Sequence, residues 1–130
     1  MTKVLIVEDE DIVARMYEKA LKFNNFEVEV AIGGNEGLEK VKSFKPDLVL
    51  LDIMMPEPDG MEVLEKIKSD PETSGLPIVM LTNLSGKHDA EHALSKGAIE
   101  YWVKSSVDIK DLGGMINNIV NEKHPENQSN

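Results

Sequence analysis

The sequence contains no cysteine, which excludes disulfide bonds and Cys-based zinc or redox chemistry. Long apolar runs are also missing. The first run covers only residues 4–7 and ends in acid, so it predicts neither a signal peptide nor a membrane anchor, and the cytoplasm is the expected compartment. Positive charge is scarce: the formal net charge is −10, so nucleic acid phosphates would repel the chain, and we expect no direct DNA or RNA binding.

The length of 130 residues suits one compact domain. Hydrophobic residues make up 41% of the chain, which is enough for a single core and too many for a disordered chain. We expect the domain to cover residues 1–121. Residues 122–130 are polar, contain Pro125 and lack periodicity, so they are predicted to form a frayed tail or the stump of a linker.

Short apolar runs alternate with segments of helical periodicity along the whole chain. Alternation of this kind predicts an α/β fold in which a parallel sheet carries helices on both faces. Apolar runs belong in the centre of such a sheet, and a strictly alternating run belongs at its edge. The predicted strands are 4–7, 27–32 (the alternating one), 48–51, 78–81 and 101–103, and the predicted helices are 11–23, 36–44, 60–69, 88–96 and 109–120. The helical spacing of the first helix predicts an inward stripe of Val13, Met16, Tyr17, Ala20 and Leu21. The fourth helix has a weaker apolar stripe, formed by Ala90, Ala93 and Leu94.

Polar side chains follow four of the predicted strands at the point where each strand ends. The acids Glu8 and Asp9 follow the first strand, and Asp52 follows the third. Thr82 and Lys104 follow the fourth and the fifth. Because ligands of open parallel sheets bind beyond the carboxyl ends of the strands, we expect these groups to form one site.

The charge of these groups predicts a cation. Glu8, Asp9 and Asp52 together carry about −3, and carboxylates that lie close together repel one another unless a cation joins them. A site with only oxygen ligands suits a hard divalent cation, Mg²⁺ first and Mn²⁺ as the alternative. Beside such a cation, Asp52 could act as a carboxylate nucleophile and form an aspartyl phosphate, with Lys104 as a point charge on the phosphoryl oxygens.

Five segments in this order resemble the receiver domains of response regulators in two-component signalling, and the resemblance covers residues 3–121. Each segment alone is weak, but their order and their positions at strand ends make the match specific. The segments are LIVEDE at 5–10, PDLVLLDIMMP at 46–56, DG at 59–60, PIVMLT at 77–82 and YWVK at 101–104.

The resemblance implies a flavodoxin-like fold of five βα units with strand order 2-1-3-4-5. It also implies that Asp52 accepts the phosphoryl group from a histidine kinase, a phosphotransfer protein or a small phosphodonor. Asp9 and Asp52 would bind Mg²⁺ directly, Glu8 would bind it through water, and Met54 would contribute its backbone carbonyl.

The same resemblance implies a switch. Thr82 and Lys104 would contact the phosphoryl group, and Tyr101 would turn inward as Thr82 moves toward the phosphate. The face built from the fourth helix, the fifth strand and the fifth helix would then change its preference for a downstream protein or output domain. The chain would be a signalling protein rather than an enzyme acting on other substrates. We expect a monomer, with a phosphorylation-dependent dimer as the alternative.

Three positions depart from the family pattern. Ser105 stands where proline usually follows the lysine through a cis peptide bond, and Asn83 stands where a small residue usually leaves the phosphoryl site open. Glu8 replaces the commoner aspartate, and its longer reach suits a role through water. Met54 and Leu84 would flank the path of an attacking water, and since neither can position that water, we predict slow self-dephosphorylation.

Other sequence features are predicted to be structural only. Asp59 and Gly60 are typical of a turn before a helix. His88 and His92 have the spacing of metal ligands on a helix, but no third ligand of known geometry accompanies them, so a solvated helix face is expected. Trp102 is interpreted as an ordinary strand aromatic.

Competing functions of the same fold class fit the residues less well. A flavodoxin-type module needs a glycine- and hydroxyl-rich phosphate loop after the first strand, where this chain has the acids Glu8, Asp9 and Glu10. A phosphatase with an aspartate nucleophile needs a second acid two residues after Asp52, where Met54 stands. The alternative that stays open is a degenerate receiver that acts as a constitutive protein-binding module.

Overall fold

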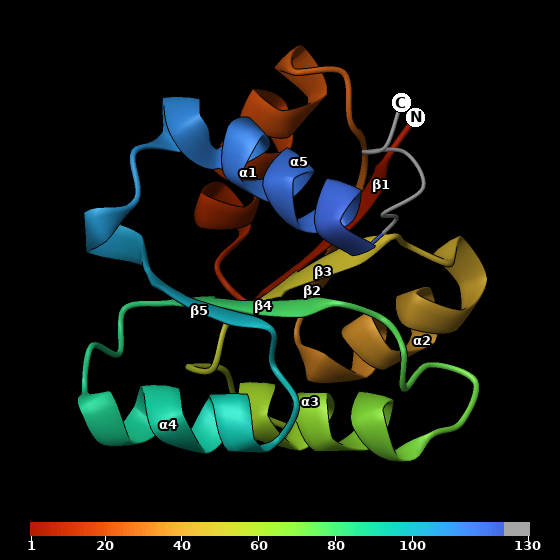
Figure 1. Ribbon diagram of the computed structural model, residues 1–130, viewed down its shortest axis with the longest axis vertical. Coiled ribbons are helices and arrows are strands. Elements are labelled where there is room, and N and C mark those ends of the chain that lie inside the picture. The colour runs from red at the N-terminus through yellow and green to blue at the C-terminus, as the bar shows by residue number, and fades with distance from the viewer. Residues whose placement is uncertain (124–130) are drawn as a thin grey trace.

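The computed structural model describes residues 1–123, which form five strands and five helices in alternation (Figure 1). The strands are β1 (Lys3–Glu8), β2 (Glu27–Ile32), β3 (Leu48–Leu51), β4 (Ile78–Thr82) and β5 (Glu100–Val103). The helices are α1 (Asp11–Phe23), α2 (Gly34–Phe44), α3 (Gly60–Ser69), α4 (Lys87–Ser95) and α5 (Leu112–Lys123), and two 3₁₀ turns, η1 (Lys104–Ser106) and η2 (Ile109–Asp111), lie between β5 and α5.

All strand pairs are parallel, and the order across the sheet is β2-β1-β3-β4-β5, which confirms the predicted fold. The alternating strand β2 lies at the edge, as expected. Val28 and Val30 are buried there, while Glu27 and Glu29 are exposed. Charged side chains on an edge strand discourage pairing with another chain.

Two cores lie on opposite faces of the sheet, because successive side chains of a strand point to opposite faces. Helices α1 and α5 cover one face, and α2, α3 and α4 cover the other (Figure 1). The central strands β1, β3 and β4 are therefore buried on both sides, which explains their continuous apolar runs. Burial of a Leu or Ile side chain such as Leu50 or Ile78 contributes about 1.5–3 kcal/mol.

Helix α1 buries a different stripe from the one expected. The periodicity predicted Met16 on the inward face, but Met16 is 49% exposed, and Ala14, Tyr17 and Leu21 are the buried residues. Ile12 and Phe23 are 85% and 88% exposed. At 100° per residue, Ile12, Met16 and Phe23 fall within about 40° of one another, so α1 carries an exposed apolar stripe on its outer face.

Helix α4 packs weakly. Ala93 is its buried residue, and Leu94, which the periodicity predicted to face inward, is 46% exposed. His88 and His92 are exposed with stacked rings, in keeping with the predicted solvated face.

The C-terminal helix begins later than predicted. The Asp108 side chain accepts a hydrogen bond from the Lys110 backbone N–H and stabilises the turn η2, so α5 begins only at Leu112. Residues 122 and 123, which the polar composition assigned to a tail, form the end of α5. The rest of that predicted tail, 124–130, lies outside the described residues. Within residues 1–123 no helix has the length and apolar character needed to cross a membrane.

Candidate functional site

The carboxyl edge of the sheet collects the polar residues that the sequence placed at strand ends. Strand β1 lies beside β3, and β3 beside β4, with Val7 opposite Leu51 and Leu51 opposite Met80. Glu8, the last residue of β1, and Asp52, the first residue after β3, thus follow directly on the paired residues Val7 and Leu51. Thr82 ends β4 opposite Val103, so Lys104 leaves β5 at the same edge.

Three carboxylates converge at this edge. Glu8, Asp9 and Asp52 each offer an oxygen, and these oxygens lie within 4.8 Å of one another. Glu8 is 2% exposed and Asp52 is 6% exposed. Buried carboxylates in such proximity repel each other strongly, and a set of hard oxygen donors fits a cation such as Mg²⁺. The three carboxylates therefore fit the divalent cation that the sequence predicted.

Lys104 lies across this cluster. Its Nζ donates one hydrogen bond to Glu8 Oε1 and another, of 3.0 Å, to Asp52 Oδ2. The residue starts the turn η1, and among the described residues the cis peptide bond joins Glu57 and Pro58, so Lys104–Ser105 is trans. The lysine therefore reaches the carboxylates without the proline that usually follows it in the family.

The two buried acids differ in acidity. Burial raises the pKa of the Glu8 carboxyl to about 7, and its hydrogen bond to Lys104 offsets only part of this effect. Burial alone would also raise the pKa of the Asp52 carboxyl, but hydrogen bonds with Glu8 and Lys104 lower it below its ordinary value. Asp52 is therefore the ionised member of the pair near neutral pH, which is the protonation state that the role expected from the sequence requires.

The loop after β3 holds Asp52 in position. The Met54 backbone N–H donates a 3.1 Å hydrogen bond to Asp52 Oδ1. Gly60, at the start of α3, lies so close that a Cβ there would be 2.1 Å from the Asp52 carbonyl oxygen. The sequence suggested only a turn at Gly60. Its packing against the site could not be inferred, because a glycine is required here by a contact between residues that are apart in the chain.

A second chain of contacts links Thr82 to Tyr101. Thr82 is fully buried, and its Oγ1 accepts a 3.4 Å hydrogen bond from the Leu84 backbone N–H. The Tyr101 hydroxyl donates a 2.7 Å hydrogen bond to the Leu84 carbonyl. The sequence suggested roles for Thr82 and Tyr101, but not that Leu84 joins them through its backbone. Asn83 is exposed at the same edge.

Tyr17 is a further residue near the site that sequence reasoning placed only on a helix face. It borders a small cavity of about 10 Å³ together with Glu8, Asp52 and Lys104. Burial raises the pKa of the Tyr17 hydroxyl, so the ring stays neutral beneath the charged groups. No local signal in the sequence distinguishes such a tyrosine from an ordinary core aromatic.

A family model described as the response regulator receiver domain matches residues 4–117 of this chain. The chain belongs to this family. Response regulator ArlR of Staphylococcus saprophyticus is 41% identical over 112 residues, which cover 86% of this chain and 49% of the relative. The receiver domain described here thus spans about half the length of the curated relatives it matches.

Solved structures share the fold of this receiver domain. A CheY-like response regulator receiver domain protein from Methanospirillum hungatei JF-1 has a TM-score of 0.88 at 30% identity, covering 97% of this chain and 98% of the other. The Mn²⁺-bound form of response regulator Rcp1 has a TM-score of 0.75 at 28% identity, covering 93% of each chain. The resemblance predicted from the five segments is confirmed.

Proposed function

We propose that this receiver domain accepts a phosphoryl group on Asp52 and so acts as a phosphorylation-controlled switch. The observation that carries the proposal is the position of Asp52, an ionised carboxylate held by Lys104 and the Met54 N–H beside two further acids. In the transfer, an Asp52 oxygen attacks phosphorus and forms an O–P bond. The bond from phosphorus to the donor breaks, and its electron pair leaves with the donor group, a phosphohistidine nitrogen or an acetyl phosphate oxygen.

Asp9 and Asp52 would hold Mg²⁺ directly, with Glu8 acting through water and Met54 offering its backbone carbonyl. When bound, the cation supplies positive charge that neutralises the phosphoryl oxygens. Mn²⁺ is the alternative, supported by the Mn²⁺-bound form of the structural relative Rcp1. The acidic cluster supports a hard cation of either kind.

Lys104 and Thr82 would contact the phosphoryl group once it is attached. Lys104 already donates to Asp52 and would pair with the new oxygens as a point charge. Movement of the Thr82 hydroxyl would release the Leu84 N–H, and the Leu84 carbonyl holds the Tyr101 hydroxyl. This connection supports Tyr101 as the residue that carries the change to the face of α4, β5 and α5, where a downstream protein would bind.

The phosphodonor would be a sensor histidine kinase or a phosphotransfer protein that docks on α1. Any donor must reach Asp52, and α1 begins at Asp11, directly beside the acidic cluster. Its outer stripe of Ile12, Met16 and Phe23 offers exposed apolar side chains of the kind that mark protein-binding surfaces. We propose that the domain acts as a monomer before phosphorylation. Its cytoplasmic location stays a prediction.

The test is incubation of the chain with acetyl phosphate, with and without Mg²⁺, followed by intact mass measurement. We expect a gain of one phosphoryl group that needs Mg²⁺, is absent in Asp52→Asn and is retained in the control Asp11→Asn. A gain that survives in Asp52→Asn contradicts the acceptor. No gain, either from acetyl phosphate or from a panel of phosphorylated histidine kinases, would favour the degenerate receiver that binds constitutively.

A further inference from the structure

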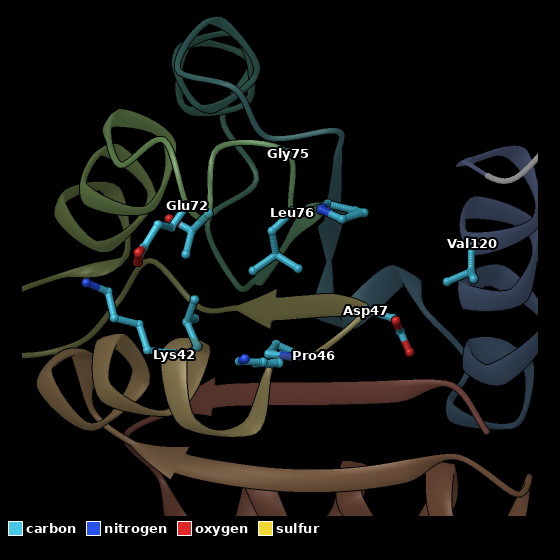
Figure 2. Close-up of a pocket in the computed structure, with 11 residues that line it drawn as sticks. Lys42, Pro46, Asp47, Glu72, Gly75, Leu76 and Val120 are labelled. Atoms are coloured by element: carbon cyan, nitrogen blue, oxygen red, sulfur yellow. The ribbon is translucent and has the colours of Figure 1, made fainter.

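A groove of about 560 Å³ lies where β3 and β4 begin, at the edge of the sheet opposite the acidic cluster (Figure 2). Its walls come from the end of α2, the loops before β3 and β4, and α5. In Figure 2, Lys42 and Glu72 lie at one side, Leu76 and Pro46 in the middle, and Val120 at the other side. Binding sites for small molecules commonly have roughly 300–1,000 Å³ and combine apolar walls with a few polar groups. The groove therefore has the size and the lining of a small-molecule site.

Several polar side chains of the groove are already engaged within the domain. Lys42 Nζ lies 3.2 Å from Asp70 Oδ2. The Asp47 carboxylate accepts a 2.8 Å hydrogen bond from the Lys3 backbone N–H. The Thr73 hydroxyl donates a 2.7 Å hydrogen bond to a backbone carbonyl of α3. These side chains stabilise the walls of the groove and have little capacity left for a ligand.

Lys45 is the lining cation that lacks such a partner. It is exposed, and it makes no ion pair with any residue of the range 1–123. It ends α2 in the left-handed conformation, with a φ of 53°. Glycine is favoured there, because the Cβ of any other residue crowds the backbone. Residues that hold an unfavourable backbone conformation occur preferentially at functional sites, so Lys45 is the group to which a ligand should be matched.

The charges around the groove limit the ligand to a single negative charge. Glu72 lies at the same side as Lys42, and Asp47 lies at the opposite side (Figure 2). Acids at both sides would repel a dianion such as a phosphate monoester, and Lys45 can neutralise one charge only. A monocarboxylate therefore fits Lys45 best, and an apolar body attached to it fits the middle of the groove.

We propose that the groove binds a small amphipathic carboxylate, with its carboxylate on Lys45 and its apolar body on Pro46 and Leu76. Burial of the apolar body supplies the affinity, and the ion pair supplies the preference for a negative charge. The groove and Asp52 lie at opposite ends of β3, so the ligand would not compete with a phosphodonor. The domain would thus have a second ligand, independent of its phosphorylation chemistry.

The test uses the full chain labelled with ¹⁵N and the probe 4-phenylbutyrate. A ligand of about twelve non-hydrogen atoms should bind with a Kd of about a millimolar. We expect saturable shifts of the Gly75 and Leu76 amide signals. The cation 4-phenylbutylamine should bind roughly tenfold more weakly, although the net charge of −10 favours cations. A preference for the carboxylate therefore reports the groove and not the whole surface.

Variants of Lys45 test the ion pair. Lys45→Glu should reverse the order of the two probes, whereas Lys19→Glu on α1, with the same change in net charge, should keep it. Lys45→Gly removes the ammonium group and relieves the left-handed backbone. We expect it to weaken 4-phenylbutyrate binding roughly fivefold without lowering the melting temperature. A lysine that only stabilised α2 would give the opposite result, a lower melting temperature with unchanged binding.

A filled groove tests the location. Gly75→Leu places a side chain in the groove at a point where a Cβ meets no atom within 4 Å, and it should abolish binding. Gly114→Leu, at an equally open position on α5, should leave binding unchanged. Equal affinity of the parent for the two probes would overturn the proposal, as would binding that survives Gly75→Leu. The absence of saturable shifts at about ten times the expected Kd would overturn it as well.

Discussion

The Nζ of Lys104 lies 3.0 Å from Asp52 Oδ2 although the two residues are 52 positions apart in the sequence. The same Nζ also donates to Glu8. One lysine therefore holds two buried carboxylates that would otherwise repel each other. One of these carboxylates, Asp52, is the residue proposed to receive the phosphoryl group. Loss of the lysine would leave both buried carboxylates without their shared cation, which is costly.

Lys104→Ala should lower the free energy of unfolding of the metal-free protein by roughly 1–3 kcal/mol, because Glu8 and Asp52 lose their shared cation. Urea denaturation in EDTA measures this change. Lys110→Ala removes an exposed lysine whose Nζ lies 3.6 Å from Asp108 Oδ2, and it should change the free energy of unfolding by less than about 0.5 kcal/mol. Mg²⁺ affinity should largely survive in Lys104→Ala. Equal stability of the Lys104 variant and the parent would contradict the bridging role.

The stability of the metal-free protein should fall as pH rises from about 4.5 to about 7. The pKa of Glu8 rises from its ordinary 4.5 to about 7 on folding, so in this window the folded chain keeps a proton that the unfolded chain has released. The pKa of Asp52 is lowered and that of Lys104 is raised, so both groups titrate outside the window.

Across this pH window we expect the free energy of unfolding of the parent to fall by roughly 1–3 kcal/mol. Glu8→Gln should abolish this fall, because glutamine does not titrate. Glu10→Gln, at an exposed acid, is the matched control and should keep the decrease. Urea midpoints at pH 5 and pH 7.5 in EDTA provide the measurement. A parent protein as stable at pH 7.5 as at pH 5 would rule out the raised pKa.

Asp9→Asn should weaken Mg²⁺ binding at least about tenfold, since the cluster loses one of three carboxylates. Trp102, the single tryptophan, lies two residues before Lys104 and should report binding through its fluorescence. Glu10→Gln changes the net charge equally and should bind Mg²⁺ as the parent does. If both variants lost affinity to the same small extent, Asp9 would act only through general charge.

Gly60→Ala should destabilise the protein by more than about 2 kcal/mol, because the added Cβ would lie 2.1 Å from the Asp52 carbonyl oxygen. Gly114→Ala, on α5, meets no atom within 4 Å and should stabilise the protein by up to about 1 kcal/mol. Thermal unfolding of both variants checks the pair. If Gly60→Ala unfolded at the same temperature as the parent, the backbone of the loop after β3 would be able to shift and accommodate the added Cβ at little cost.

The phosphorylated parent should hydrolyse slowly, because Met54 and Leu84 cannot position an attacking water. Met54 is 54% exposed, so Met54→Asn should place a polar group at the rim without disturbing the core and shorten the phosphorylated lifetime roughly tenfold. Met16→Asn, at an exposed methionine of α1, should leave the phosphorylated lifetime unchanged. Loss of the phosphorylated mass after removal of acetyl phosphate gives the rate. A parent lifetime of seconds would refute slow hydrolysis.

The sequence by itself determined the order of the elements and the ends of the strands. Alternation of apolar runs with helical periods depends on local burial, so α1, β2, β3 and α3 were predicted with their observed bounds. The acids, Thr82 and Lys104 follow the strands directly, and parallel strands end at one edge. Candidate site residues could therefore be named from the chain alone.

The tertiary structure decided what depends on contacts between distant residues. The helical period could not show which of two adjacent faces of α1 packs inward, and Met16 proved to be exposed. The late start of α5 depends on the cap made by Asp108. The bridge from Lys104 to Glu8, the fit of Gly60 against Asp52 and the link through Leu84 are set by the packing of separate elements, whereas sequence patterns report only the surroundings of neighbouring residues.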